Sequence, residues 1–238
     1  VYKRQVPYGK MSVFYACSTN KERNVISTRI FAEHIQKNHP DVNEGSSDLN
    51  NCDGIPLNTV ILEGTMYHSE TKKEVGKKFS NFLINNYGDA DVKSSDGNRR
   101  IDPALKFYSG IPLMINHNRD LVKTGRANGT LCRGHSLKMK PNYNLGWKNW
   151  DEKKVITVSV KNIGYIVCEE WQDDSKLLGG IQDKVFLKLK PEIVSVNIPL
   201  KIMGHNMGKL TSLKIMQFPV NSNIATTGHK LQGQTKKF

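Results

Sequence analysis

Hydrophobic residues recur along this chain with two different periods. Short apolar runs at residues 11–18 and 110–116 predict buried β-strands. Residues 19–40 and 75–88 instead space their apolar side chains at three- and four-residue intervals, which predicts two amphipathic helices. A strand that runs directly into a helix is the opening of an α/β unit, so we expect the chain to begin as α/β.

The start of the first helix has a local signature. Thr19 and Glu22 have the spacing of a capping box, in which the hydroxyl caps the helix and the acid reaches back. Pro40 closes the helical pattern because proline cannot continue a helix. We therefore expect a strand, a tight turn and a helix in immediate succession.

The later part of the chain changes to a strand pattern. Asn128-Gly129 is a strong hairpin signal and precedes an alternating stretch. Further strand-like runs occupy residues 154–171, 184–190, 193–203 and 210–220. Short strands with turns between them predict a small barrel or sandwich over residues 125–218. A β-module inserted into an α/β domain would produce this order.

The charge of the chain favours a polyanionic partner. The formal net charge is +13, and no Asp or Glu follows Glu192. Nucleic acid is the first expectation and an anionic membrane surface the second, while a merely solvated basic surface is the alternative. No apolar run reaches the roughly 20 residues of a membrane span, so we expect no membrane partner.

The cysteines predict neither disulfides nor a metal site. Four cysteines show no Cys-x-x-Cys spacing, which favours free thiols and an intracellular protein. Cys132 and His135 form a single C-x-x-H, but a zinc site needs about four ligands. We therefore expect no metal centre.

Residues 204–212, GHNMGKLTS, suggest a Walker A loop, which the spacing excludes. Such a loop has four residues between its first Gly and its Gly-Lys pair, and Ser or Thr after the Lys. Here three residues intervene and Leu210 follows Lys209. The segment also lies between two predicted strands, so a turn with a basic tip is the better interpretation.

Three stretches, in order along the chain, carry a resemblance to a known family. They are ACSTNKERNVISTRIF (16–31), SGIPLMINHNRDLVKTGRANGTLCRG (109–134) and FPVNSNIATTGHKLQGQT (218–235). Together they resemble the second motor domain of Pif-type, RecD-like DNA helicases of superfamily 1B. Departures from the family pattern are Ser27, Gly228, Leu231 and one extra residue between Asn118 and Gly125.

The resemblance implies a fold and a domain order. The fold is α/β, a RecA-like P-loop NTPase-type second motor domain that lacks Walker A and contains an inserted small SH-three-like β-barrel. Residues 1–125 would form the first part of the RecA-like domain, residues 126–217 the barrel-like module, and residues 218–238 the return to the RecA-like domain. We expect the chain to be truncated at both ends, with the first motor domain of the same polypeptide before residue 1.

The resemblance also implies an activity. It implies an ATP-dependent DNA helicase that translocates on single-stranded DNA and unwinds duplex, with ATP and Mg²⁺ bound mainly outside this chain. Such a protein would act in DNA repair, recombination or telomere maintenance. It would lie in the nucleus or mitochondrion of a eukaryote, or in the cytoplasm of a bacterium or in a virus-infected cell.

The implied site residues form two sets. Gln232 and Gly233 are assigned to the nucleotide cleft and are the candidate catalytic residues. The candidate DNA-binding residues are Thr19, Asn20, Asn128, Gly129, Thr130, Thr226, Thr227, His229 and Lys230. Lysine neutralises phosphate, while hydroxyls, amides and helix N-termini add neutral phosphate contacts.

Each of these residues also has a purely structural interpretation. Thr19, Thr227 or His229 could cap a helix, and Asn128 to Thr130 could be only a hairpin turn. For the whole chain, two other functions stay open. One is a non-enzymatic basic module that binds single-stranded nucleic acid, and the other is a degenerate transposon-derived helicase relic.

Overall fold

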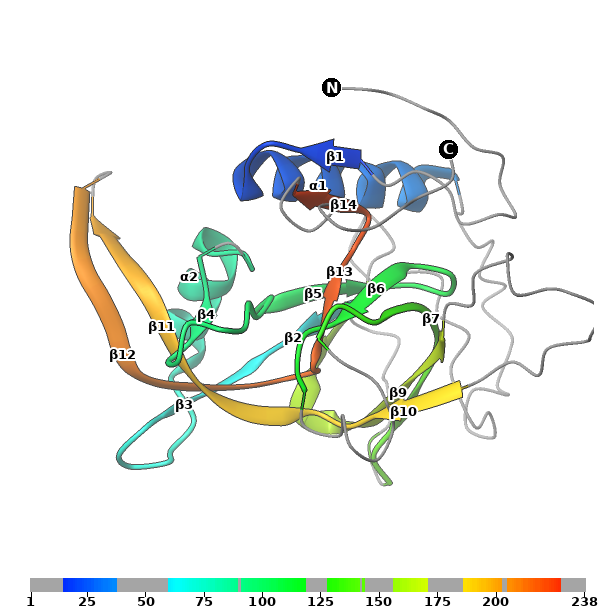
Figure 1. Cartoon of the computed structure of the whole chain (residues 1–238). Coiled ribbons are helices and arrows are strands. Elements are labelled where there is room, and N and C mark those ends of the chain that lie inside the picture. Colours follow the sequence, from blue (N-terminus) through cyan, green and yellow to red (C-terminus); the bar gives the residue numbers. More distant parts are fainter. Residues whose placement is uncertain are drawn as a thin grey trace, which may run out of the picture.

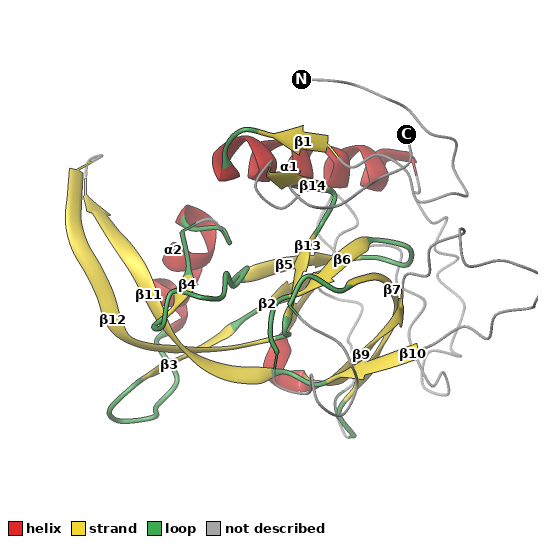
Figure 2. Cartoon of the chain, in the orientation of Figure 1, coloured by secondary structure: helices red, strands yellow, loops and turns green. Residues whose placement is uncertain are grey.

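The computed structural model describes most of the chain. The described residues are 15–37, 60–89, 91–118, 128–141, 143, 156–170, 186–202 and 205–227. Within them the protein is mostly β-sheet with two α-helices (Figure 2). No described helix combines the length and the apolar character that crossing a membrane requires.

The two helices begin and end close to the predicted positions. They are α1 (Asn20–Lys37) and α2 (Lys77–Asn86). Leu83 is fully buried, whereas Phe79 and Phe82 of the same helix are 39% and 47% exposed. The apolar spacing therefore predicted a helix correctly but overstated how many of its aromatic side chains enter the core.

The strands form four hydrogen-bonded sheets. A parallel pair joins β1 (Tyr15–Cys17) and β14 (Ala225–Thr227). A five-stranded sheet has the order β10 (Phe186–Leu189), β9 (Ile163–Glu170), β7 (Leu131–Met139), β6 (Pro112–Ile115) and β13 (Val220–Ser222). A four-stranded sheet has the order β3 (Thr65–His68), β12 (His205–Gln217), β11 (Glu192–Ile202) and β4 (Lys93–Ser94). A three-stranded sheet has the order β5 (Ala104–Phe107), β2 (Val60–Glu63) and β8 (Ile156–Ser159), and a short 3₁₀ helix at Val160–Asn162 joins β8 to β9.

Only one unit of the described fold has the α/β pattern expected for a RecA-like domain. β1 leads directly into α1, and β14 returns from the far end of the chain to lie beside β1 (Figure 1). The other sheets are mainly antiparallel, except for the parallel pairing of β2 with β8. The predicted RecA-like fold is therefore only loosely supported, and its support among the described residues comes from the β1–α1–β14 unit.

The β-rich part is wider than residues 125–218. Its strands begin at Val60, because β2, β3 and β6 supply partners to β8, β12 and β7. The sheets therefore connect segments on both sides of residue 125. The boundaries 125/126 and 217/218, and the barrel-like character of the module between them, stay predictions.

Two hydrophobic clusters fill the interior. The larger lies under the five- and three-stranded sheets and takes in Phe31 from α1. The smaller packs α2 onto the four-stranded sheet through Leu83, Tyr87 and residues of β11 and β12. Phe31 also lies against Tyr108, with ring centroids 6.2 Å apart, which anchors α1 to the larger cluster.

Gly134 is required where β7 crosses the turn at residues 108–111. A Cβ at Gly134 would lie 2.8 Å from the Ile111 side chain and 2.9 Å from the Tyr108 carbonyl oxygen. The Gly134 N–H donates to the Ile111 carbonyl at 2.9 Å, so the close approach is also a backbone contact. A side chain here would push apart the strands that hold the larger cluster together.

Candidate nucleic-acid interface

Predicted site residues from the two ends of the chain lie at one edge. In the parallel pair, Ala16 is opposite Thr226 and Cys17 is opposite Thr227. The carboxyl ends of parallel strands point the same way, so Thr19 and Asn20, which follow β1, lie at the same end of the strand pair as Thr227. His229, Lys230, Gln232 and Gly233 continue from β14 but lie outside the described residues.

The predicted capping box is present and is confirmed as the start of α1. The Glu22 N–H donates to Thr19 Oγ1 at 3.2 Å, and Glu22 Oε2 accepts from the Thr19 N–H at 3.2 Å. The same carboxylate accepts the Ser18 N–H at 3.0 Å and the Ser18 hydroxyl at 2.7 Å. The Ser18 hydroxyl first, and then the backbone N–H groups, lower the pKa of Glu22. An ionised carboxylate therefore already occupies this helix start, where a phosphate contact was predicted.

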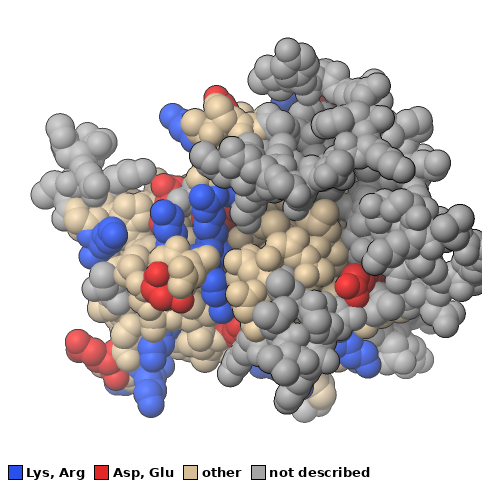
Figure 3. All heavy atoms as spheres, viewed as in Figure 1, with Lys and Arg blue, Asp and Glu red and all other residues tan. Residues whose placement is uncertain are grey.

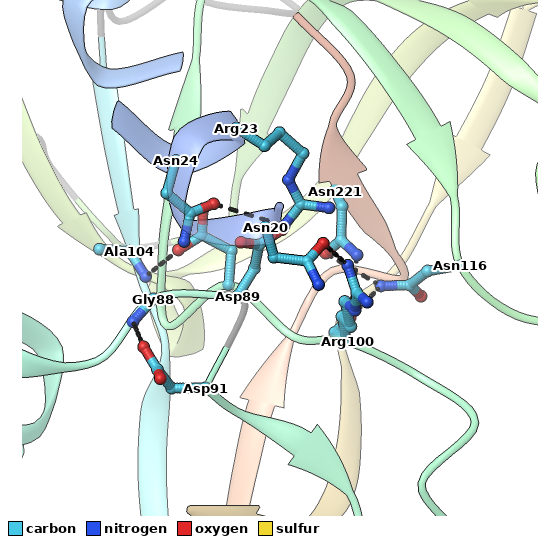
Figure 4. Close-up of polar contacts among 11 residues, drawn as sticks. Asn20, Arg23, Asn24, Gly88, Asp89, Asp91, Arg100, Ala104, Asn116 and Asn221 are labelled. Atoms are coloured by element: carbon cyan, nitrogen blue, oxygen red, sulfur yellow. Dashed lines mark hydrogen bonds and ion pairs between the residues drawn. The ribbon is translucent and has the colours of Figure 1, made fainter. Parts of the chain in front are cut away.

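Asn20 is held in place by Arg100, a residue that the sequence did not single out. Its Oδ1 accepts a hydrogen bond from the Arg100 guanidinium (Figure 4). Loss of hydration on burial is the main cause that lowers the pKa of Arg100. Asn20 thus fixes α1 to the segment before β5, and its role in binding DNA stays a prediction.

A buried ion pair fastens the same helix one turn later. Arg23 Nη2 contacts Asp89 Oδ2, and both residues are buried, at 5% and 6% exposure (Figure 4). Two charges in a poorly hydrated environment are tolerated only when they are paired. The pair therefore links α1 to the turn that follows α2.

Amide side chains extend this polar network toward β6 and β13. Asn116 Nδ2 donates to the Arg100 carbonyl at 2.9 Å and to Asn221 Oδ1 at 3.2 Å. Asn221 Nδ2 donates to the same carbonyl at 3.0 Å. Arg99 Nη2 reaches Asn116 Oδ1 at 3.3 Å, while Arg99 Nη1 pairs with Glu192 at 3.2 Å. The network joins four distant parts of the chain.

A small pocket lies beside this network. Its lining residues are Arg23, Asn24, Ser27, Thr28, Gly88, Asp89, Asp102, Lys106 and Ser222. Burial first, and then the charge of Asp89, raise the pKa of Asp102 to about 6, while Lys106 acts in the opposite direction. The pocket volume of about 110 Å³ is well below the roughly 300–1,000 Å³ of sites that enclose a drug-sized ligand, so it does not accommodate a nucleotide.

Asn128 and Gly129 lie in a turn that leads into β7, where the sequence placed a hairpin signal, but they do not by themselves close a two-residue hairpin with β6. The Gly129 N–H donates to the Ile115 carbonyl and the Ile115 N–H donates to the Thr130 carbonyl, both at 2.9 Å. These residues therefore continue the β6–β7 ladder instead of closing it, and the Asn128 N–H meets Asn118 Oδ1 at 2.6 Å. Gly129 has φ 104°, which distorts the ladder locally where a side chain would be strained.

The structure confirms that residues 204–212 are not a P-loop. Residues 205–212 belong to β12, which pairs with β11 in a long hairpin, and no helix follows. The predicted turn with a basic tip is wrong for these residues, because Lys209 lies inside β12 and pairs with Pro199 of β11. At the described strand-to-helix connection between β1 and α1, the Ser18 and Thr19 N–H groups already donate to Glu22, so these two groups are not offered to a nucleotide triphosphate.

The three described cysteines, Cys17, Cys132 and Cys168, are buried in strands and form no disulfide, while Cys52 lies outside the described residues. Cys132 is fully buried in β7 whereas His135 is exposed, so the two cannot share a zinc ion. The Cys132 thiol and burial raise the pKa of Cys168 well above its ordinary value. No group of three or more potential metal ligands occurs in the described part of the chain.

Sequence interpretation missed the residues that organise this edge. Arg23, Asp89, Arg99 and Arg100 were not among the residues that the sequence singled out. The paired arginines and the acids before them were a visible signal, but their partners lie more than 60 residues away along the chain. On the face in Figure 3, Lys and Arg side chains gather over the region of α2 and β4, below α1.

No protein-family model and no curated protein sequence matches this chain. Among solved structures, it is similar to the Pif1 helicase of Candida albicans, with 16% identity and a TM-score of 0.48, covering 98% of this chain and 40% of that one. It is also similar to Bacteroides Pif1 bound to single-stranded DNA, with 14% identity and a TM-score of 0.45, covering 99% of this chain and 35% of that one. A third structure, Bacteroides Pif1 with ADP-AlF₃ and single-stranded DNA, has 14% identity and a TM-score of 0.44. These values are too low to transfer chemistry, and the chain spans well under two thirds of those proteins.

Proposed function

We propose that this chain is part of an ATP-dependent DNA helicase of the Pif type, and that its β1–β14 edge contacts single-stranded DNA. One observation carries the proposal. The parallel register of β1 with β14 brings the first and last of three ordered motifs to the same edge, although about 200 residues separate them. Folding of one motif by itself does not require the other motif to lie beside it.

The roles within this edge follow from the chemistry of its residues. Thr226, Thr227, His229 and Lys230 are assigned to the DNA strand, since hydroxyls and a lysine ammonium suit phosphate oxygens. The Glu22 carboxylate shifts the expected phosphate contact away from the first turn of α1 and toward the segment after Thr227. Asn128 to Thr130 are proposed as contacts at the end of the β6–β7 ladder.

The nucleotide chemistry belongs to other parts of the proposed helicase. Gln232 and Gly233 are assigned to a cleft shared with a first motor domain of the same polypeptide, which would hold ATP and Mg²⁺. Hydrolysis of ATP in that cleft would drive movement of the protein along the DNA strand. Roles in repair, recombination or telomere maintenance, and the corresponding cell compartment, belong to this proposal as well.

A second candidate is a basic, non-enzymatic module that binds single-stranded nucleic acid. The mostly β-sheet architecture and the net charge of +13 favour it. A P-loop elsewhere in the same polypeptide separates the two candidates, because only the helicase needs one. A polypeptide without any P-loop would leave the binding module as the function.

Binding to a labelled oligothymidine across a salt series tests the proposed edge. We expect fluorescence anisotropy to show weak binding that falls linearly with salt on logarithmic axes, and no ATP hydrolysis by this chain alone. Lys230→Ala is expected to weaken binding several-fold and to reduce the salt slope by about one. Lys78→Ala, at an exposed position on α2, is the matched control. Affinity that ignores salt, or equal losses in both variants, would refute the assignment.

A further inference from the structure

The five-stranded sheet has a solvent-facing side with an unusual composition. Along β9 and β10 the inward residues Ile166, Cys168 and Leu187 are buried, so the residues between them face outward. In the pairing, Arg133 and Phe186 both lie opposite Glu169. The outer face of β7, β9 and β10 consists of Arg133, His135, Ser136, Lys138, Tyr165, Val167, Glu169, Phe186 and Lys188.

Cations and aromatic rings alternate on this outer face. Lys188 Nζ lies 5.5 Å from the centroid of the Tyr165 ring. The His135 and Phe186 rings meet edge to face, with centroids 5.0 Å apart. Phe186 is 48% exposed although it is a large apolar side chain on a strand. Its ring is therefore oriented by a neighbour but is not removed from water.

The charges of the outer face match a polyanion. Arg133, Lys138 and Lys188 are cationic, and Glu169 is its single carboxylate. Arg133 and Phe186 flank that carboxylate through strand pairing, which places a counter-charge beside it. The face thus keeps excess positive charge around rings that remain accessible.

This combination distinguishes the outer face from the other exposed aromatic pair. Phe79 and Phe82 on α2 stack on each other, with centroids 6.4 Å apart and an interplanar angle of 17°. The ring faces that Phe79 and Phe82 turn toward each other are therefore not available to a ligand. Among the described residues, the Phe186 ring meets His135 at an interplanar angle of 72°, and Phe186 stays 48% exposed, which leaves part of its surface for another flat group.

We propose that the outer face of β7, β9 and β10 binds an unpaired nucleic-acid segment, with Phe186 stacking on a base and Lys188 neutralising a phosphate. Bases stack on aromatic side chains whatever their sequence, and a positively charged sheet guides the backbone past them. Tyr165 holds Lys188 in place through its ring. This surface is separate from the β1–β14 edge, and it needs neither ATP nor a motor domain.

Two oligonucleotides distinguish stacking from simple charge attraction. The probes are a fluorescein-labelled oligothymidine of about 15 nucleotides and an abasic strand of equal length and charge. We expect Phe186→Ala to weaken binding of the oligothymidine about tenfold and to leave the abasic strand unchanged. Lys188→Ala is expected to weaken binding of both strands by about the same factor.

Two further variants complete the experiment. Phe82→Ala removes an aromatic ring of similar exposure from α2 and should change neither probe. Lys230→Ala reports on the β1–β14 edge in the same assay. Weaker oligothymidine binding in the Phe186 variant, with unchanged binding in the Lys230 variant, would support binding at the outer face and refute binding at the β1–β14 edge. Weaker binding in the Lys230 variant, with unchanged binding in the Phe186 variant, would overturn binding at the outer face and leave the β1–β14 edge supported.

Three other results would overturn the inference. Equal weakening of both probes by Phe186→Ala would show a structural effect instead of stacking. No change in the Phe186 and Lys188 variants would show that bases do not meet this face. Tighter binding of an acidic peptide than of either strand, lost in the same variants, would assign the face to a protein partner.

Discussion

Two polar regions of this protein use similar residues in opposite ways. At the start of α1, Arg23 and Asp89 are buried and bound to each other, and Asn20 and Arg100 are joined in the same network. On the outer face of β7, β9 and β10, Lys188, His135 and Phe186 remain exposed to solvent. Burial obliges polar groups to find partners within the fold, whereas exposed groups can still bind a ligand.

This contrast changes the meaning of the α1 motif. The Thr19 hydroxyl and the Asn20 amide were candidates for DNA contact, but capping and anchoring already use them. The first motif can therefore be retained for folding even where DNA is bound by neighbouring residues. Apart from Arg133, the outer face lies outside the three motifs, yet its His135, Phe186 and Lys188 side chains remain accessible.

The largest expected effect comes from breaking the buried ion pair. Arg23→Ala would leave the Asp89 carboxylate unpaired in a poorly hydrated site, which should lower the free energy of unfolding by about 3–5 kcal/mol. Chemical denaturation measures this loss. Arg29→Ala is the control on the same helix, because its pair with Glu33 is exposed and contributes about 0.5 kcal/mol or less. Similar losses in both variants would contradict the contrast between buried and exposed charges.

A smaller effect should appear as a pH dependence of stability. The folded pKa of Asp102 is raised from 3.8 to about 6, so its protonated form is favoured in the folded protein. This contribution is fully present below about pH 4 and is lost as the pH rises through 6. Relative to Asp102→Asn, the unsubstituted protein should lose about 2–3 kcal/mol between pH 4 and pH 7.

Denaturation curves at several pH values test this prediction. Asp96→Asn is a control of opposite sign, because hydrogen bonds from Ser94 first, and then from the Asn98 N–H, lower the pKa of Asp96. Parallel pH curves for the unsubstituted protein and Asp102→Asn would show that burial does not perturb Asp102.

The smallest predicted loss concerns the helix cap. Thr19→Ala removes the oxygen that accepts the Glu22 N–H and should cost about 1 kcal/mol. Thr19→Ser keeps that oxygen and should retain most of the stability. If Thr19→Ala instead left stability unchanged but abolished DNA binding, the Thr19 hydroxyl would be a ligand-binding group and not a helix cap.

Local patterns in the sequence were sufficient for the parts of the fold that depend on near neighbours. Thr19 and Glu22 are three residues apart, so one turn of chain brings them together whatever surrounds it. The alternation in β7 and the apolar run before Asn116 likewise predicted strands. The absence of a P-loop at residues 204–212 followed from spacing alone.

Tertiary structure decided everything that depends on distant partners. The parallel pairing of β1 with β14, the Arg23–Asp89 pair and the contact of Arg100 with Asn20 join segments that no local period relates. The Asn128-Gly129 signal located a turn before β7, but the hydrogen bonds of Gly129 and Thr130 with Ile115 depend on how β6 lies beside β7. Short-range geometry is written in the order of the residues, but which polar groups are buried, and hence already satisfied, depends on how the sheets pack.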